Sequence, residues 1–427
     1  MRNPMLFRFS LYGFLKNQQY YDPFIILAFL EKGMSFFQIG LLVGIRELSV
    51  TVMEVPSGVI ADLYGRRRSM IFSFFCYIVS FVLFAMGTTF WQLAIAMMFF
   101  ATGTAFREGT HKAMILDWLR LEGREDEKTM TYGYTRSWSK MGSALSVIIA
   151  AALVFSTGSY SYVFLFTIVP YLLGIVNFLG YPVELDGRPE GVATVGNAVR
   201  HLGLAFKRAF GYRRLRRILI EVAGLDSTIK VTKDYLQPVI QQMAIGLPVL
   251  VAVTDDVQRT AVLAGAVYFV LYIVSMVASR RAHRFARRFG GESRAARALW
   301  VSAALLFLMM TVSLGLGVLV PAVVGFILLE LLRNYERPVM ITRVDNETAA
   351  TMGATMLSIE SQVRAIAAMV LAPLIGYGVD RLAAAPDRPA LWVVAAVGLA
   401  VGLVGALTPA MSPAPAELRG GASGQKT

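Results

Sequence analysis

Long apolar stretches alternate with short polar ones along nearly the whole chain. A bilayer core about 30 Å thick needs roughly 20 mostly apolar residues for one helical crossing. The pattern therefore predicts an all-α polytopic membrane protein with twelve transmembrane helices. We place these helices near residues 7–30, 36–60, 70–88, 91–117, 132–156, 161–182, 218–242, 259–281, 295–314, 318–341, 353–377 and 389–409.

The composition agrees with a lipid environment. Only 16% of the residues are charged and 56% are hydrophobic, whereas about 25% of the residues of a soluble domain are charged. The single cysteine, Cys76, lies in an apolar stretch and excludes an internal disulfide or a multi-cysteine metal site. The histidines are scattered at His111, His201 and His283, and no catalytic spacing is visible. We therefore expect neither an enzyme nor a cofactor.

The net charge of +13 comes largely from residues between the apolar stretches. Segments 184–217 and 280–297 are rich in arginine, whereas segments 31–36 and 157–160 carry almost no positive charge. Lys and Arg concentrate in the cytoplasmic loops of membrane proteins, so both termini are predicted to be cytoplasmic. This placement explains the charge without nucleic acid as a partner. Residues 184–217 are predicted to form a basic linker against anionic headgroups.

The two halves of the chain carry similar residues at corresponding positions. Pro23 in the first stretch has a counterpart in Pro238 in the seventh. Arg107 in the fourth stretch has a counterpart in Arg333 in the tenth. Halves related in this way place a solute site at their interface, near the middle of the membrane. We therefore divide the chain into an N-terminal six-helix bundle (1–183), a basic cytoplasmic linker (184–217), a C-terminal six-helix bundle (218–410) and a disordered cytoplasmic tail (411–427).

A charged loop joins the second and third predicted helices, and it reads Gly58-Val59-Ile60-Ala61-Asp62-Leu63-Tyr64-Gly65-Arg66-Arg67-Arg68. This loop resembles the signature of the major facilitator superfamily, Gly-x-x-x-Asp-x-x-x-Arg-Arg/Lys. Five residues occupy the positions of that pattern: Gly58, Asp62, Gly65, Arg66 and Arg67. Gly58 is expected to let the helix end approach a neighbour closely, and Gly65 to permit a tight turn. Asp62 is expected to cap a helix N-terminus or to pair with an arginine.

The resemblance extends over nearly the whole chain. Residues 103–109, with Asp117 beyond them, resemble the fourth helix of the family, and residues 352–358 resemble the start of its eleventh. Residues 279–291 resemble a second copy of the signature loop that lacks the aspartate. The fifth stretch lacks the Gly-Pro motif of the family's antiporters, which makes a drug–proton antiporter less expected.

The resemblance implies two pseudo-symmetric six-helix bundles and a transporter in the bacterial cytoplasmic (inner) membrane. The signature loop would then latch the two halves on the cytoplasmic side during alternating access. The resemblance also implies a cavity lined by the first, second, fourth, fifth, seventh, eighth, tenth and eleventh helices. The remaining four helices would be peripheral.

Many ionisable residues lie inside the stretches that would line this cavity. An ionisable group at bilayer depth normally faces the protein interior, where it belongs to a transport pathway or to an ion pair. One interpretation is that these charges form internal ion pairs that fix helix register. Residues four apart can pair on one helix face, as in Glu108–Lys112, Asp226–Lys230, Lys230–Asp234 and Glu360–Arg364.

The other interpretation assigns some of these groups to transport. Polar and cationic side chains are predicted to bind the solute: Lys16, Gln19, Arg46, Arg107, Lys230 and Arg333. A buried carboxylate can load and release a proton as access alternates, and the carboxylates predicted to do so are Glu47, Glu54, Glu108 and Asp226. Cations and acids are balanced inside these stretches, so the charge of the solute stays open at this point.

We therefore predict a monomeric secondary active transporter that moves a polar or charged small organic solute and is coupled to protons. Its partners would be the solute, protons and the lipid bilayer. Two alternatives stay open: an exporter of amphipathic drugs or lipids, and a solute sensor with the same fold that does not transport. The direction of transport is not predicted by the sequence.

Overall fold

The computed structural model describes residues 4–186, 210–247, 255–289, 291–346, 353–383 and 390–408, with isolated positions between 196 and 207. All regular secondary structure in these residues is helical. The first half contains α1 (Pro4–Leu15), α2 (Ile25–Glu31), α3 (Phe36–Tyr64), α4 (Arg66–Met86), α5 (Phe90–Arg107), α6 (Thr110–Leu121), η1 (Glu125–Glu127), α7 (Lys128–Thr157), α8 (Tyr162–Leu179) and η2 (Val183–Asp186). The second half contains α10 (Arg213–Asp234), α11 (Leu236–Gly246), α12 (Asp256–Arg288), α13 (Glu292–Gly315), α14 (Leu319–Asn346), α15 (Gly353–Arg381) and α16 (Trp392–Leu407).

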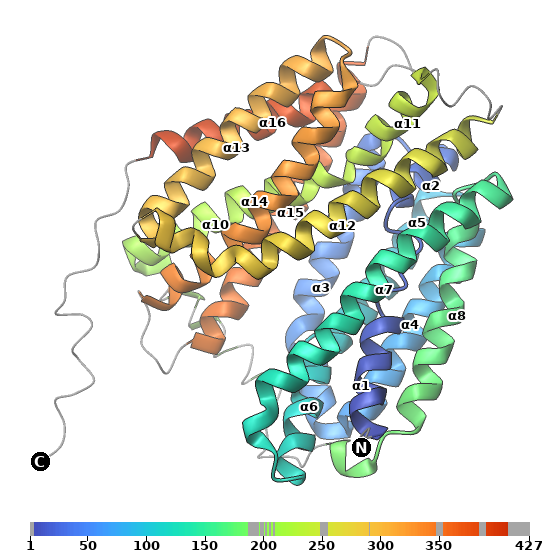
Figure 1. Ribbon diagram of the computed structural model, residues 1–427, viewed down its shortest axis with the longest axis vertical. Helices are drawn as coiled ribbons and strands as arrows, with labels where there is room; N and C mark the ends of the chain where they lie inside the picture. The colour runs from blue at the N-terminus through green and yellow to red at the C-terminus, as the bar shows by residue number, and fades with distance from the viewer. Residues whose placement is uncertain are drawn as a thin grey trace, which may run out of the picture.

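The helices form two bundles that lie side by side (Figure 1). We call α1–α8 the first bundle and α10–α16 the second bundle. The prediction of an all-α protein with two helical bundles is confirmed, and helices occupy each of the predicted stretches. Half of the predicted linker at 184–217 and all of the predicted tail at 411–427 lie outside the described residues.

Three of the predicted helices are each broken into two. The stretch 7–30 is divided into α1 and α2, the stretch 91–117 into α5 and α6, and the stretch 218–242 into α10 and α11. At the second break Gly109 has a φ of +82°, a conformation that residues with a side chain rarely adopt. Pro23 lies in the first break, where it cannot donate a helical hydrogen bond. The prediction of continuous helices was wrong there, because mean hydropathy over a long window does not detect a local break.

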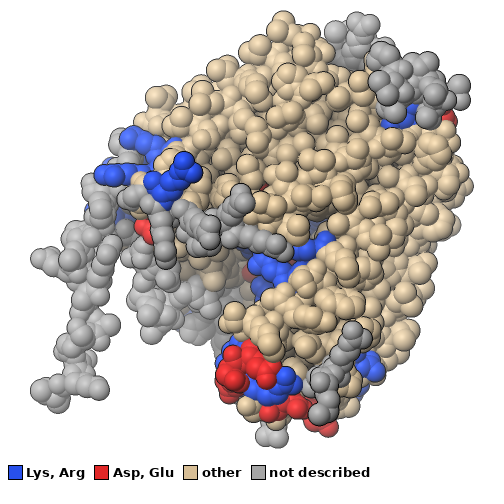
Figure 2. Space-filling view, viewed as in Figure 1, with Lys and Arg blue, Asp and Glu red and all other residues tan. Residues whose placement is uncertain are grey.

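The apolar surface of the long helices fits a lipid environment. Seven helical segments in the described residues are long and apolar enough to cross a membrane: Phe36–Tyr64, Arg66–Met86, Glu125–Thr157, Tyr162–Leu179, Asp256–Ser279, Glu292–Gly315 and Met356–Arg381. Figure 2 shows a broad surface without charged side chains, with Lys, Arg, Asp and Glu gathered toward the ends of the molecule and in the hollow between the bundles. The protein is therefore a multi-pass membrane protein.

Helices α3 and α15 bring the two bundles into close contact. A Cβ atom added at Gly40 of α3 would lie 2.4 Å from the carbonyl oxygen of Ala372. A Cβ atom added at Gly376 of α15 would lie 2.1 Å from the carbonyl oxygen of Phe36. Glycine is therefore required at both positions, because no side chain fits between the two backbones. Small residues commonly allow this kind of approach between membrane helices.

Polar contacts join the bundles on the same side. The carboxylate of Asp380 in α15 accepts hydrogen bonds from the amides of Phe36 and Phe37 at 3.1 and 2.8 Å. These amides belong to the first turn of α3, whose N–H groups have no partner within the helix. The side chain of Gln237 in α11 accepts a hydrogen bond from the amide of Ile26 at 2.8 Å and donates one to the carbonyl of Asp22 at 2.9 Å. We call this region of the interface the closed side.

Candidate functional site

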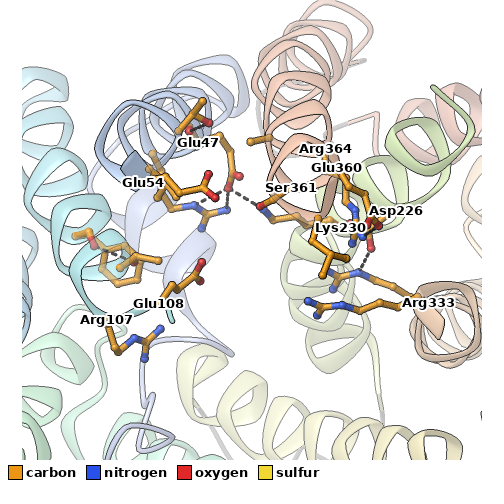
Figure 3. Close-up of a pocket in the computed structure, with 18 of the residues that line it drawn as sticks. Glu47, Glu54, Arg107, Glu108, Asp226, Lys230, Arg333, Glu360, Ser361 and Arg364 are labelled. Atoms are coloured by element: carbon orange, nitrogen blue, oxygen red, sulfur yellow. Dashed lines mark hydrogen bonds and ion pairs between the residues drawn. The ribbon is translucent and has the colours of Figure 1, made fainter. Parts of the chain in front are cut away.

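A cavity of about 640 Å³ lies between the two bundles. Figure 3 shows charged side chains facing one another across it from helices of both bundles. The first bundle contributes Gln19, Tyr21, Arg46, Glu47, Val50, Thr51, Glu54, Tyr77, Phe100, Thr104, Arg107, Glu108 and Lys112. The second bundle contributes Asp226, Lys230, Arg333, Arg337, Ile341, Leu357, Glu360, Ser361, Arg364 and Ala365.

The cavity includes every residue of the predicted solute and proton sites except Lys16. Lys16 lies behind the wall, with its ammonium group 5.3 Å from the centre of the Tyr12 ring. The helices that line the cavity differ from those implied by the resemblance. Among the described residues, α7 and α12 contribute none, whereas α4, expected to be peripheral, contributes Tyr77.

An ion pair joins the two bundles across the cavity. The ammonium of Lys230 in α10 lies 2.8 Å from the carboxylate of Glu47 in α3. The guanidinium of Arg46 binds the same carboxylate oxygen at 2.9 Å. Glu47 is only 6% exposed, so this carboxylate is both buried and held by two cations. A buried carboxylate that lost these partners would become an uncompensated charge.

A second ion cluster lies within the second bundle and centres on Asp226. The carboxylate of Asp226 lies 2.7 Å from Nε of Arg333 and 3.5 Å from the guanidinium of Arg364. Arg364 also pairs with Glu360, and Arg333 lies 3.7 Å from the carboxylate of Glu330. Arg333 and Arg364 are therefore already neutralised by carboxylates of the protein itself, whereas Arg337 of the same wall forms no ion pair with any described residue.

In the wall formed by the first bundle, the cation Arg107 contacts an aromatic ring instead of a carboxylate. The guanidinium of Arg107 lies over the ring of Tyr77, 5.4 Å from its centre, and it forms no ion pair with any described residue. The Tyr77 hydroxyl is hydrogen-bonded to Thr104 at 2.8 Å, which holds the ring in place. Glu54 accepts a hydrogen bond from Ser358 of the second bundle at 2.9 Å. Arg107 is therefore a cavity cation whose charge is available to a ligand.

The pairs predicted from a spacing of four residues are mostly not formed. Only Glu360–Arg364 is present within the described part of the chain. Lys230 binds Glu47 of the other bundle instead of Asp226 or Asp234. Glu108 and Lys112 do not share a helix, because α5 ends at Arg107 and Gly109 turns the chain. Tertiary neighbours therefore replace the neighbours expected along a continuous helix.

The signature loop binds only to its own bundle in this conformation, as far as the described residues show. Arg66 pairs with Asp117 of α6 and with Asp62 at 3.4 Å. The amide of Arg67 donates to the carboxylate of Asp186 at 2.7 Å. The α4 N-terminus is thus bound by Asp186, a residue that the sequence analysis did not identify.

The two glycines of the loop have different roles. Gly65 has a φ of +102° between α3 and α4, so the expected tight turn is confirmed. A Cβ atom added at Gly58 would have no neighbour within 4 Å. The expected close approach at Gly58 is therefore wrong in this conformation, since the helix face that carries it is open.

Several cavity residues were not predicted as site residues, among them Tyr77, Arg337 and Ser361. Arg337 lies four residues after Arg333, and this spacing on one helix face was a signal that could have identified it. Tyr77 and Ser361 had no comparable signal, because aromatic and hydroxyl side chains are common in membrane helices. Among the described residues, no group of His, Cys, Asp and Glu could hold a metal ion.

A charged cavity between two helical bundles of a multi-pass membrane protein defines a membrane transporter rather than an enzyme. The comparison with known families names the kind of transporter. The chain belongs to the Major Facilitator Superfamily, whose family model matches residues 17–359. The predicted family and transporter class are confirmed.

Curated relatives match only part of the chain. The uncharacterized MFS-type transporter YxaM of Bacillus subtilis (strain 168) is 31% identical over 106 residues, which are 25% of this chain and 26% of that protein. The uncharacterized transporter BU466 of Buchnera aphidicola is 28% identical over 107 residues, 24% of this chain and 27% of that protein. The matched region thus spans about a quarter of each relative.

Solved structures resemble the chain over almost its whole length. The nucleoside transporter NupG has a TM-score of 0.76 and 12% identity, with 95% of this chain and 98% of that chain covered. A peptide transporter POT in complex with sulfate has a TM-score of 0.69 and 14% identity over 94% and 93% of the two chains. A D-xylose–proton symporter has a TM-score of 0.64 and 13% identity over 96% and 98%. At these identities the likeness establishes the fold alone.

Proposed function

We propose that the protein is a monomeric secondary active transporter of the bacterial inner membrane that moves a polar or charged small organic solute by alternating access and is coupled to protons. The observation that carries this proposal is the cavity of about 640 Å³ between the bundles, with charged walls from both sides. Charges at bilayer depth are costly and normally serve a pathway. Both termini are proposed to be cytoplasmic, on the basis of the arginine-rich segments.

The charge distribution favours a solute with an anionic group. Arg333 and Arg364 are engaged by Asp226. Three cavity cations, Arg107, Lys112 and Arg337, have no carboxylate partner among the described residues, against two cavity carboxylates without a cation, Glu54 and Glu108. A guanidinium recognises a carboxylate or phosphate through two parallel hydrogen bonds. In this proposal Arg107 binds the anionic group, while Gln19 and Lys230 contact other polar groups of the solute.

The conformation described here fits a state that opens to the cytoplasm. Asp380, Gln237 and the glycines at 40 and 376 join the bundles on the closed side. At the other end, the described contacts of Asp62, Arg66 and Arg67 remain within the first bundle. In the outward-facing state the closed side would separate, and the signature loop would latch the bundles together at the cytoplasmic end.

A ligand screen tests the proposed solute class. The purified full-length protein is heated in detergent with sets of small anionic, cationic and neutral metabolites, since a ligand that binds the folded state raises its apparent stability. We expect stabilisation by carboxylates or phosphates, and loss of that stabilisation in Arg107→Gln. Stabilisation only by cationic or neutral compounds would contradict the proposed role of Arg107.

Flux in proteoliposomes tests the coupling. The compound found in the screen is supplied in radiolabelled form with and without an imposed proton gradient. We expect uptake to accelerate when the gradient is present and to fall when it is collapsed by a protonophore. Uptake of the same solute at an unchanged rate in both conditions would show that transport is not coupled to protons.

A further inference from the structure

Glu336 is a buried carboxylate of α14 that belongs neither to the predicted site nor to the cavity wall. Its side chain is 0% exposed. Neither of its carboxylate oxygens accepts a hydrogen bond from any described residue. Arg333 and Arg337, on the same helix, line the cavity, so Glu336 lies one layer behind the wall.

Among the described residues, no cation is placed against the carboxylate of Glu336: Arg337, the next residue, lines the cavity and forms no hydrogen bond with either carboxylate oxygen. Asp226 and Glu360 repel an anion at this position, and Arg364 and Arg333 attract one. Both arginines are already engaged, because Arg333 pairs with Asp226 and Glu330, and Arg364 pairs with Asp226 and Glu360. Three carboxylates thus share two arginines before Glu336 is counted.

The other helices packed against α14 do not supply a counter-ion within the described residues. On α10, Glu221 pairs with Arg343 of α14 at 2.8 Å, and the lysines Lys230 and Lys233 pair with Glu47 and Asp22 at 2.8 and 3.5 Å. On α12, Tyr272 donates to the carboxylate of Asp22 at 2.7 Å, and the buried Tyr268 is an uncharged phenol. Helix α11 has no acidic or basic side chain, and those of α13 lie in its first two turns, at Glu292, Arg294 and Arg297.

An ionised carboxylate in this position would be a buried charge without a partner. Such a group takes up a proton instead of remaining charged, because a neutral carboxyl is far less costly to bury. Glu47 and Asp226 stand in the opposite situation, since each is held by two cations. Their surroundings favour the charged form, so neither is as suited to carry a proton in this conformation.

We propose that Glu336 is the proton-binding residue of the transport cycle and that it holds a proton in the conformation described here. This proposal rests on the proton coupling proposed above. It differs from the carboxylates selected from the sequence, all of which lie in the cavity wall.

Release of that proton would change the ion cluster around Asp226. The proton passes to cavity water, and the carboxylate left behind attracts Arg364 and Arg333. Nε of Arg364 is a buried donor without an acceptor among the described residues, so it is the donor ready to bind this anion. Any movement of Arg364 toward Glu336 weakens its contact with Asp226 at 3.5 Å. Loss of the proton is thereby transmitted from α14 to α10 and α15, which form the cavity wall.

Infrared spectroscopy of the full-length protein in liposomes tests the proposal without requiring a solute. A protonated carboxyl has a C=O stretching band that ionised carboxylates lack and that shifts in heavy water. We expect such a band near neutral pH in the unmodified protein and its loss in Glu336→Gln. Glu221→Gln is the matched control, because Glu221 is also largely buried but is paired with Arg343 at 2.8 Å and lies outside the Asp226 cluster, and this variant should keep the band.

Thermal unfolding provides a second readout. Glu336→Gln replaces one neutral group by another of similar shape, so its midpoint should stay close to that of the unmodified protein. Glu221→Gln, which breaks the pair with Arg343, should unfold at a lower temperature. A band that persists in Glu336→Gln, or a large loss of stability in that variant, would overturn the proposal. The band could be lost in Glu336→Gln while the rate of solute flux does not depend on the proton gradient. In that case Glu336 binds a proton, and only the proton coupling proposed above is wrong.

Discussion

Asp226 is the carboxylate on which the charges of the second bundle converge. It is 4% exposed and bound by both Arg333 and Arg364. Removing one partner of a buried ion pair is strongly destabilising, because the remaining charge is left without compensation. The two arginines would then repel each other in the cavity wall.

Asp226→Asn is therefore expected to destabilise the protein by about 3–5 kcal/mol. Thermal or denaturant unfolding of the purified protein in detergent measures the effect. Glu125→Gln is the control, because Glu125 forms an exposed pair with Lys128 that should contribute little. Equal stability of the two variants would show that Asp226 is not the structural centre of this cluster.

Arg107 and Arg333 occupy matching positions in the two halves, but the structure gives them different surroundings. Arg107→Gln is expected to weaken solute binding by roughly 10- to 100-fold, since a hydrogen bond to a charged group contributes about 1.5–3 kcal/mol. Arg107→Lys should recover only part of this loss, because an ammonium cannot make the paired contacts of a guanidinium.

Equilibrium binding of the solute from the ligand screen measures this difference. The matched control is Arg124→Gln, which removes an arginine of the first bundle that pairs with Glu127 outside the cavity. Its solute affinity should stay near that of the unmodified protein. Unchanged affinity in Arg107→Gln would contradict a direct contact with the solute.

The sequence could predict most of the charged side chains that line the cavity, but only one of their predicted pairs, Glu360–Arg364, is formed among the described residues. Because a charge is costly to place in lipid, ionisable residues within apolar stretches, such as Glu47 and Arg333, can be recognised in the sequence as interior residues. Their partners come from other helices, so no spacing along the chain identifies Lys230 as the partner of Glu47. Glu336 was missed for a related reason, because its isolation depends on how its neighbours are already paired.

Among the helices, α3 and α15 form the contact that sets the distance between the bundles. The close approach depends on Gly40 and Gly376, where any side chain meets the opposing backbone. Packed membrane helices gain stability mainly from such close packing, because the surrounding lipid is as apolar as the side chains themselves.

Gly376→Ala is expected to destabilise the closed side by about 1–3 kcal/mol, the usual cost of an additional methyl group in a packed interior. Gly58→Ala is the matched control, since Gly58 is also helical but its added methyl would meet nothing within 4 Å. That control should be neutral or slightly stabilising, because alanine favours a helix over glycine. Unfolding of both variants measures the difference, and equal loss in both would contradict the contact.

The existence and order of the helices could be predicted from hydropathy, whereas their breaks could not. The apolar length of a helix is a property of a whole segment, so hydropathy averaged over a window still detects the helix. A break such as the one at Gly109 depends on a single φ angle, and glycines are frequent enough in membrane helices that Gly109 does not stand out. The breaks matter for the site, because Arg107 lies at the end of α5, immediately before this turn.

For the whole molecule, the central claim is that the cavity is reached from one side at a time. The closed side is held by contacts between α3 and α15 in the conformation described here. The protein has a single cysteine, Cys76, so one substitution provides a background for cysteine labelling. Ser361 lies in the cavity wall and serves as the reporter position. Phe37 and Tyr377, whose rings lie 5.9 Å apart, serve as positions for a crosslink across the closed side.

The most direct test combines Cys76→Ala, Ser361→Cys, Phe37→Cys and Tyr377→Cys in membrane vesicles of both orientations. Mild oxidation joins positions 37 and 377 by a disulfide crosslink and leaves the lone thiol at position 361 free. An impermeant thiol reagent is then added from one side, and labelling at position 361 is read by mass spectrometry. Without the crosslink, we expect position 361 to be labelled from both sides. With it, we expect labelling only from the side that carries the N-terminus. Labelling from the opposite side in the crosslinked protein, or none from that side without the crosslink, would contradict alternating access through this cavity.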